Sequence, residues 1–291
     1  MLPHERLSYV PITQRPRLTL PDGKRMAVWI IVNIEEWDPT QTMPRTVLTP
    51  PAGGSPTPDI PNWAWHEYGN RVGFWRLLKM FDRLSLPAVL AINGTAVESY
   101  RPITDAAIER GWEFMGHGYT QKNMQKVDDE AADIAKTTEA IRQATGTRPR
   151  GWLGPGLTET WETPDRLVEA GYDYVCDWVL DDQPVELATR AGPIHNIPYT
   201  QECNDVAMML IQHHSAREYF QRASDQFDQL YEDSEEGARI MALVLHPYIM
   251  GVPHRAPYVR QILEKIAATP DVAVWSGSQI LDWYTAQTAP A

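Results

Sequence analysis

The chain has 291 residues and a formal net charge of −12. An acidic chain argues against nucleic acid or an anionic membrane surface as a partner, because both select basic patches. No stretch approaches the ~20 apolar residues of a membrane span, and the first residues contain no apolar run of signal-peptide length. We therefore expect a cytoplasmic protein that acts on a small molecule.

Length and cysteine content favour a single domain. One (β/α) barrel commonly reaches about 250 residues or more, so residues 1–291 do not require a second domain. Cys176 and Cys203 are the two cysteines of the chain. Two are too few for a disulfide framework or a Cys-based zinc site, so we expect both to be buried packing residues.

Short apolar runs alternate with longer segments of helical period, which predicts βα units around a parallel sheet. Helical spacing of apolar residues predicts a helix over residues 70–84, and Ser276 with Gln279 forms a capping box that begins the last helix. Eight runs are predicted as strands, at residues 27–34, 88–92, 113–115, 151–153, 172–175, 194–197, 241–245 and 272–275.

Residues 38–68 interrupt this alternation. The segment is rich in proline, which disfavours helix interiors and central strands, so we predict a long loop without a regular helix. Loops of this length tend to be lids, binding loops or oligomer contacts, although a loop merely wrapped over the barrel is the alternative. Aromatic residues near its end would suit any of these roles: Trp63, Trp65, His66 and Tyr68.

Polar residues follow several predicted strands. The carboxyl ends of the strands form the active face of a parallel barrel, so we expect Glu35, His117 and His246 to converge. Asn33 and Glu35 lie on the same side of their strand by its period of two, and a carboxylate there can act as a general base if burial raises its pKa. The alternatives are a structural acceptor for Glu35 and a satisfied polar residue for His117.

Four segments, residues 33–36, 116–119, 151–156 and 245–247, resemble successive motifs of the polysaccharide deacetylase superfamily in order and spacing over nearly the whole chain. The closer resemblance is to its cytoplasmic branch, which includes metal-independent allantoinases and cyclic imide hydrolases, and residues 197–200 with 204–205 resemble that branch too. This resemblance implies an α/β fold, a distorted (β/α) barrel of parallel strands that is often seven-stranded. One of the eight predicted strands is then expected to lie outside the barrel.

The chain also departs from the family pattern. Secreted deacetylases use an Asp-Asp pair, a His-x-x-x-His motif and an arginine, whereas this chain has Glu35 and Glu36, a single His117 followed by Gln121, and Leu153 near the position of the arginine. A single imidazole with one neutral amide does not make a tight zinc site. We predict no metal cofactor, with weak binding of zinc or another divalent ion by Glu36 and His117 as the alternative.

The resemblance and the residues together predict a hydrolase that opens C–N bonds of small cyclic amides or imides. Glu35 would take a proton from water, and His246 or His117 would protonate the departing nitrogen. Backbone amides near Gly154 and Gly156, with His117, would stabilise the oxyanion. Further substrate-binding residues are predicted around the barrel mouth: Asn33, Trp37, Tyr119, Trp152, Gly154, Pro155 and Trp178.

Two other functions remain open from the sequence. One is a metal-dependent N-deacetylase of acetylated amino sugars, and the other is a non-catalytic, ligand-binding barrel. We expect a small cyclic amide or imide as the ligand, neither nucleic acid nor membrane as a partner, and a homo-oligomer with the tetramer as one form.

Overall fold

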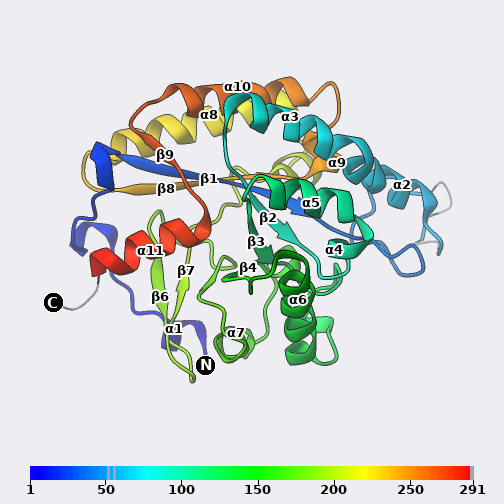
Figure 1. Ribbon diagram of the computed structural model, residues 1–291, viewed down its shortest axis with the longest axis horizontal. Coiled ribbons are helices and arrows are strands. Elements are labelled where there is room, and N and C mark those ends of the chain that lie inside the picture. The colour runs from blue at the N-terminus through cyan, green and yellow to red at the C-terminus, as the bar shows by residue number, and fades with distance from the viewer. Residues whose placement is uncertain (51–52, 55–56, 289–291) are drawn as a thin grey trace.

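The computed structural model describes residues 1–50, 53–54 and 57–288 (Figure 1). The strands are β1 (Met26–Ile34), β2 (Val89–Ile92), β3 (Glu113–Gly116), β4 (Gly151–Trp152), β5 (Tyr174–Val175), β6 (Val185–Leu187), β7 (Ile194–Asn196), β8 (Arg239–Leu245) and β9 (Val272–Val274). The α-helices are α1 (Pro3–Arg6), α2 (Ile60–Tyr68), α3 (Phe74–Leu84), α4 (Ala96–Ser99), α5 (Arg101–Glu109), α6 (Glu130–Thr145), α7 (Thr163–Glu169), α8 (Ala216–Asp233), α9 (Pro247–Met250), α10 (Ala256–Ala268) and α11 (Gly277–Thr288). Short 3₁₀ turns are η1 (Ile12–Gln14), η2 (Pro21–Gly23), η4 (Met124–Lys126) and η5 (Pro155–Leu157), and π-helical turns are η3 (Gly69–Gly73) and η6 (Val206–Ile211).

The strands form one curled sheet in the order β6-β7-β5-β4-β3-β2-β1-β8. All pairings along this order are parallel except the antiparallel pair β6 and β7. The eight strands predicted from the sequence are all present, and β9 lies off the main order because it pairs only with the start of β1. The predicted distorted (β/α) barrel is confirmed as a curled half-barrel sheet of parallel strands.

The short strand β6 was not among the predicted strands. It has three residues with a buried, exposed, buried pattern, and it pairs with β7 at the edge of the sheet. A three-residue run is too short for periodicity to identify as a strand.

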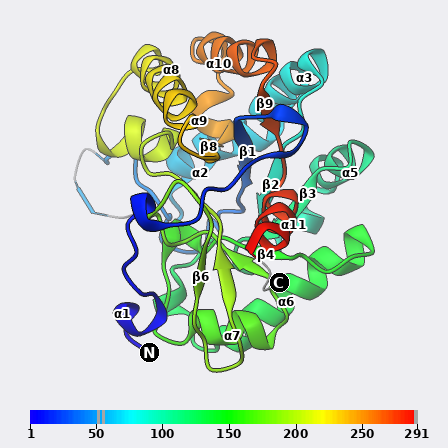
Figure 2. The same cartoon turned by 90° about the vertical axis from the view of Figure 1, so that its left-hand side faces the viewer.

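Strand β1 runs through the centre of the molecule and separates two apolar layers. Met26, Val28 and Ile30 face outward and join the core beneath α3, α8 and α10, which lie side by side above β1 and β8 (Figures 1 and 2). Trp29 and Ile31 face the concave side of the sheet, where they pack with residues of β2, β3, β8 and α11. Alternation along β1 therefore decides which of its residues can reach the interior of the half-barrel.

The segment 38–68 contains a helix that the sequence did not lead us to expect. Helix α2 begins after Asp59, whose side chain accepts a hydrogen bond from the backbone N–H of Asn62, and Pro61 occupies its first turn. Proline is tolerated there because the first N–H groups of a helix have no partner within the helix. The helix continues through η3 into α3, so only the first part of the predicted 70–84 helix is π-helical.

Two further predictions from the sequence, the buried cysteines and the capping box, are confirmed. Cys176 and Cys203 are buried free thiols. Ser276 and Gln279 form the predicted capping box, because each backbone N–H donates to the other side chain. Among the described helices, none is long and apolar enough to cross a membrane.

Candidate active site

The ends of β1, β3, β4 and β8 meet at a cavity of about 150 Å³. Glu35 follows β1, His117 follows β3 and His246 follows β8, and all three are buried and line this cavity. Asn33 also lines it, on the same side of β1 as Glu35. The structure thus brings together the carboxylate, the two imidazoles and the amide that were predicted to converge.

Nitrogen atoms of four side chains surround the carboxylate of Glu35. Its Oε2 accepts a hydrogen bond from Trp37 Nε1 at 2.7 Å. Its Oε1 lies 3.5 Å from His246 Nε2 and 3.9 Å from His117 Nε2. A third imidazole, His66, places its Nε2 4.0 Å from Oε2. The carboxylate is therefore buried without being isolated from positive and dipolar groups.

These neighbours decide the protonation state of Glu35. Burial by itself would raise the pKa of Glu35, but the hydrogen bond with His246 and the charge of His246 outweigh burial and hold this pKa well below its usual value. Burial was expected to make Glu35 a general base if it raised the pKa of this residue, and the pKa of Glu35 is instead lowered. Burial is only one of the terms, and the opposing terms come from residues that the fold gathers.

His246 is held as an imidazolium between two carboxylates. Its Nδ1 lies 2.6 Å from Asp205 Oδ1, and its backbone N–H donates to Asp205 Oδ2 at 2.6 Å. Burial opposes the charge, but Asp205 and Glu35 together raise the pKa of His246 to about 9. Both nitrogens of the ring therefore carry protons at neutral pH, and Nε2–H points toward Glu35.

His117 has the opposite character. Its Nδ1 lies 2.6 Å from the carbonyl oxygen of Leu153, to which it donates, so Nε2 is left with a lone pair on the cavity side. Burial lowers the pKa of His117 despite the nearby Glu35. The chain turns away directly after this residue at Gly118, whose φ of 70° is left-handed and whose missing Cβ leaves room for Pro155.

Asp205 and His66 are site residues that the sequence analysis did not single out. Asp205 follows Asn204, which forms an isolated parallel bridge with Val244 of β8. This bridge positions the carboxylate of Asp205 beside His246. His66 lies on α2 and stacks on Trp37 with ring centroids 4.3 Å apart. A signal for Asp205 was present in residues 204–205, where the family resemblance had been noted.

Several predicted pocket residues lie outside the cavity lining. Trp152 points to the outer face of the sheet, where it packs edge-to-face on Tyr172, because the inward position falls to Leu153, directly after β4. Trp37 lies beneath Glu35 in the outer core and only its Nε1 reaches the carboxylate. Tyr119 packs on Gly94.

The remaining predicted residues lie outside the cavity lining or already donate their N–H to another residue. Trp178 donates to Glu159 at 3.0 Å beside a separate cavity of about 390 Å³. Pro155 packs against the Gly118 turn, and Glu36 is not among the cavity residues. Gly154 lines the cavity, but its N–H donates to Asp177 Oδ1 at 2.8 Å, so this amide is not free to bind an oxyanion.

The donor atoms do not fit a zinc centre. Among the described residues, no group of three or more His, Cys, Asp or Glu side chains is arranged to hold a metal ion. Gln121 stands where the second histidine of the metal motif would be, and its Oε1 accepts a hydrogen bond from Asn93 Nδ2 at 3.0 Å. His246, with both nitrogens engaged by carboxylates, offers no lone pair.

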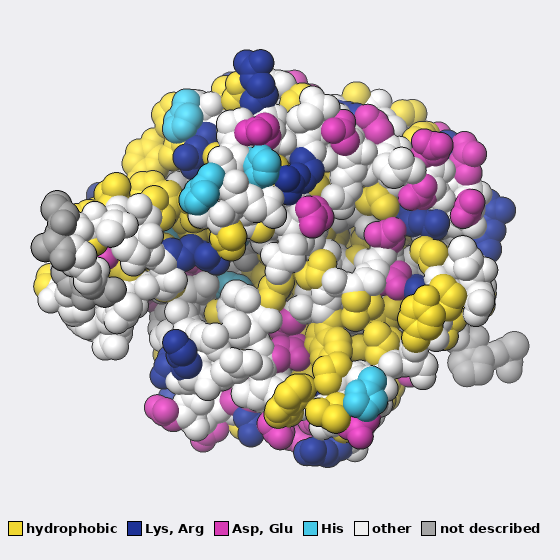
Figure 3. Space-filling model, turned by 180° about the vertical axis from the view of Figure 1, so that it is seen from behind, with side chains coloured by type: hydrophobic (Ala, Val, Ile, Leu, Met, Phe, Trp, Pro, Cys, Tyr) yellow, Lys and Arg dark blue, Asp and Glu magenta, His cyan; other side chains and the backbone are white. Residues whose placement is uncertain are grey.

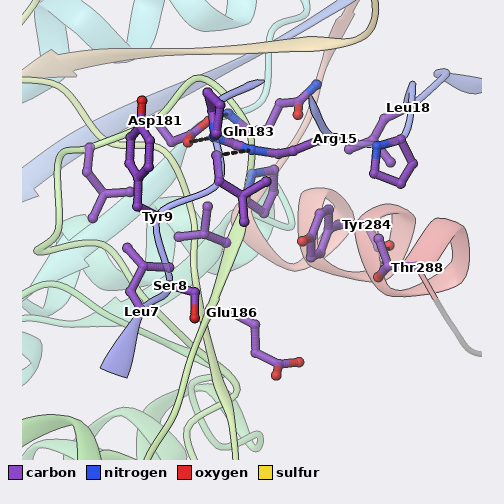
Figure 4. A pocket seen from close by; sticks show the side chains of 16 residues that line it. Leu7, Ser8, Tyr9, Arg15, Leu18, Asp181, Gln183, Glu186, Tyr284 and Thr288 are labelled. Atoms are coloured by element: carbon purple, nitrogen blue, oxygen red, sulfur yellow. Dashed lines mark hydrogen bonds and ion pairs between the residues drawn. The ribbon is translucent and has the colours of Figure 1, made fainter. Parts of the chain in front are cut away.

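A larger cavity of about 480 Å³ lies between the N-terminal segment, the residues that lead into β6, and α11 (Figure 4). Its polar feature is an ion pair in which Arg15 Nη1 donates to Asp181 Oδ1 at 2.9 Å. Tyr9, Val10 and Leu180 expose large apolar side chains there. In the lower half of the face shown in Figure 3, hydrophobic side chains gather from the centre to the right. The cavity lacks a convergent acid and imidazole, so it is not the candidate active site.

The comparisons with known proteins agree with this geometry. The polysaccharide deacetylase family model matches residues 63–175. The resemblance to the polysaccharide deacetylase superfamily is confirmed. A protein of Schizosaccharomyces pombe (strain 972 / ATCC 24843) named "Putative polysaccharide deacetylase" is 28% identical over 305 residues, which span 92% of each chain. The chain is accordingly similar to polysaccharide deacetylases, over residues 63–175 for the family model and over most of its length for this relative.

Two solved structures share the fold over nearly the whole length. The Puue allantoinase superposes with a TM-score of 0.85 at 24% identity, over 95% of this chain and 96% of the other. A probable polysaccharide deacetylase from Pseudomonas aeruginosa PAO1 superposes with a TM-score of 0.83 at 25% identity, over 96% of this chain and 97% of the other. The comparison with the allantoinase, at 24% identity, shows the fold alone.

Proposed function

We propose that this protein hydrolyses the C–N bond of small cyclic amides or imides, as an allantoinase-like or cyclic imide hydrolase, without a metal cofactor. The observation that carries the proposal is the Glu35–His246–Asp205 chain, in which an ionised carboxylate faces an imidazolium across 3.5 Å. A buried base and acid in contact can serve both halves of amide hydrolysis. The cavity of about 150 Å³ suits a compact ring better than a polymer.

The proposed steps use side chains at the strand ends. Water adds to the ring carbonyl as Glu35 takes one of its protons, which gives a tetrahedral oxyanion. The Nε2–H of His246 then protonates the ring nitrogen as the C–N bond breaks. Loss of the imidazolium charge raises the pKa of Glu35, so its carboxyl group keeps the proton until the C–N bond has broken. Glu35 returns its proton to His246 and restores the starting state.

His117 and His66 assist this exchange. The lone pair on His117 Nε2 faces the cavity and can accept a hydrogen bond from the second O–H of the attacking water. His66 is neutral, because burial lowers its pKa to about 4, and it supports Trp37 beneath the carboxylate. The backbone N–H of Gly154 donates to Asp177 and cannot also bind the oxyanion. The imidazolium of His246 and the backbone N–H of Gly156 therefore stabilise it.

A substrate panel tests the proposal. Cyclic imides, hydantoins, dihydropyrimidines, allantoin and N-acetylated oligosaccharides are assayed with and without chelator, on protein of known metal content. We expect ring opening of at least one cyclic substrate, unaffected by chelator. Release of acetate from an oligosaccharide, dependent on a divalent ion and without ring opening, would instead support the N-deacetylase. Binding without turnover of any substrate would support the non-catalytic barrel.

The cytoplasmic location and the homo-oligomer, with a tetramer as one form, are part of the proposal. The exposed apolar side chains of Tyr9, Val10 and Leu180 support an interface on that face. Light scattering coupled to size exclusion measures the mass in solution. A monomer at all concentrations would contradict the oligomer.

A further inference from the structure

The walls of the active-site cavity carry hydrogen-bond donors that the proposed chemistry does not use. Asn33 is buried on this wall, and its Nδ2 has no hydrogen-bond partner among the described residues. A buried donor without a partner costs free energy, which a ligand acceptor would recover. This amide therefore indicates where an oxygen atom of the substrate binds.

Gln121 adds a second donor on the same wall. Its Oε1 is fixed by Asn93 Nδ2 at 3.0 Å, so the amide group that remains for a ligand is the Nε2 donor. Side-chain amides of this kind donate hydrogen bonds to the carbonyl oxygens of a ring. Two such donors, Asn33 and Gln121, match the two carbonyl groups of an imide or ureide.

Among the described residues that line this cavity, Arg45 is the one Lys or Arg. It is half-buried, and no carboxylate of the described residues lies within ion-pair distance of its guanidinium. The chain next to it is anchored, because the backbone N–H groups of Val47 and Leu48 donate to Asn62 Oδ1 at 2.8 Å. Buried Met43 fixes the other side.

We propose that Arg45 is a specificity-determining residue that binds a carboxylate carried by the ring of the substrate. The inference rests on the proposed function and narrows its substrate class to anionic cyclic amides or imides. A guanidinium presents a planar fork that pairs with both oxygens of a carboxylate, whereas the neutral amides of Asn33 and Gln121 suffice for ring carbonyls. In a chain of net charge −12, an unpaired cation in a polar cavity calls for a negative ligand.

Matched substrates test this assignment. Dihydrouracil is compared with its 6-carboxylate, and hydantoin with hydantoin-5-acetate, on the full chain. We expect kcat/KM of the wild type to favour the carboxylated member of at least one pair by roughly tenfold or more, as hydrogen bonds to charged groups allow. Arg45→Met should abolish this preference by raising KM for the carboxylated ring, with kcat changed by less than about threefold.

Two variants serve as controls. Arg45→Lys keeps the charge without the fork and should restore part of the preference. Arg217→Met removes an exposed arginine outside the cavity and should leave both members of each pair unchanged. An equal loss of kcat/KM for carboxylated and unsubstituted rings in Arg45→Met would overturn the assignment. A higher kcat/KM of the wild type for the unsubstituted rings would overturn it too.

Binding separates a failure of this inference from a failure of the proposed function. Calorimetry on Glu35→Gln measures binding of each ring without turnover, and the Glu35→Gln/Arg45→Met double variant reports the contribution of Arg45. If the wild type opens no ring but binding of a carboxylated ring weakens at least about tenfold in the double variant, Arg45 still reads the carboxylate. If no carboxylated ring binds, the inference fails whatever the fate of the proposed function.

Discussion

His246 Nε2 lies 3.5 Å from Glu35 Oε1, while its other nitrogen, Nδ1, lies 2.6 Å from Asp205 Oδ1. One imidazolium is thus shared by two buried carboxylates that come from different parts of the chain. The carboxylate on the cavity side faces the substrate, and the one behind fixes the ring and its charge. This arrangement makes the protonation states, and not only the positions, of these residues testable.

Glu35→Gln should lower kcat at least about a hundredfold, because the amide keeps the size of the side chain but cannot take a proton from water. Glu36→Gln is the matched control and should change kcat by less than about threefold, since Glu36 is not among the residues that line the cavity. Steady-state kinetics on a cyclic substrate measure both. The reverse result would assign the base to Glu36.

The pH dependence of kcat/KM should have an alkaline limb near pH 9, because the pKa of His246 is raised to about 9 and the proton on Nε2 is needed for the leaving nitrogen. Asp205→Asn removes the anion that stabilises the imidazolium, so the pKa of His246 falls and the limb moves to lower pH by at least about one unit. NMR titration of the imidazole gives the same pKa directly. The exposed Asp225→Asn serves as control, and a limb that stays in place in Asp205→Asn would contradict the assignment.

His66 should make the fold sensitive to acid. Its pKa is lowered from 6.5 to about 4 by burial. Between these pH values His66 therefore binds a proton in the unfolded chain but not in the folded chain. Stability is therefore fully present above about pH 6.5 and is lost as the pH falls toward 4, by roughly 3 kcal/mol from this group. His66→Gln should flatten the fall in the free energy of unfolding between these pH values. Urea unfolding at a series of pH values measures it, and identical slopes for variant and wild type would show that His66 titrates normally.

Ring opening should survive prolonged dialysis against a chelator, because the ligand set around Glu35 does not fit zinc and the Oε1 of Gln121 is engaged by Asn93. Activity before and after dialysis is compared with the metal content from mass spectrometry. Loss of activity that stoichiometric zinc restores would show that the metal-dependent alternative holds. Gln121→His, which recreates the second imidazole, should raise zinc affinity measured by calorimetry.

The sequence by itself determined eight of the nine described strands and the polar residues that follow several of them. The period of two in β1 places Asn33 and Glu35 on one side, and the parallel βα order places His117 and His246 at the same edge of the sheet, because all strands of such a sheet end together. The capping box at Ser276 was also readable, since it depends on residues three positions apart.

Only the tertiary structure decided the chemistry at that edge. Asp205 reaches His246 through the bridge between Asn204 and β8, a contact that no local pattern encodes. His66 arrives on a helix inside a Pro-rich segment, where composition favoured a loop. The pKa of Glu35 depends chiefly on His246, which comes from a distant segment, and the direction of its shift followed from this contact and not from burial alone.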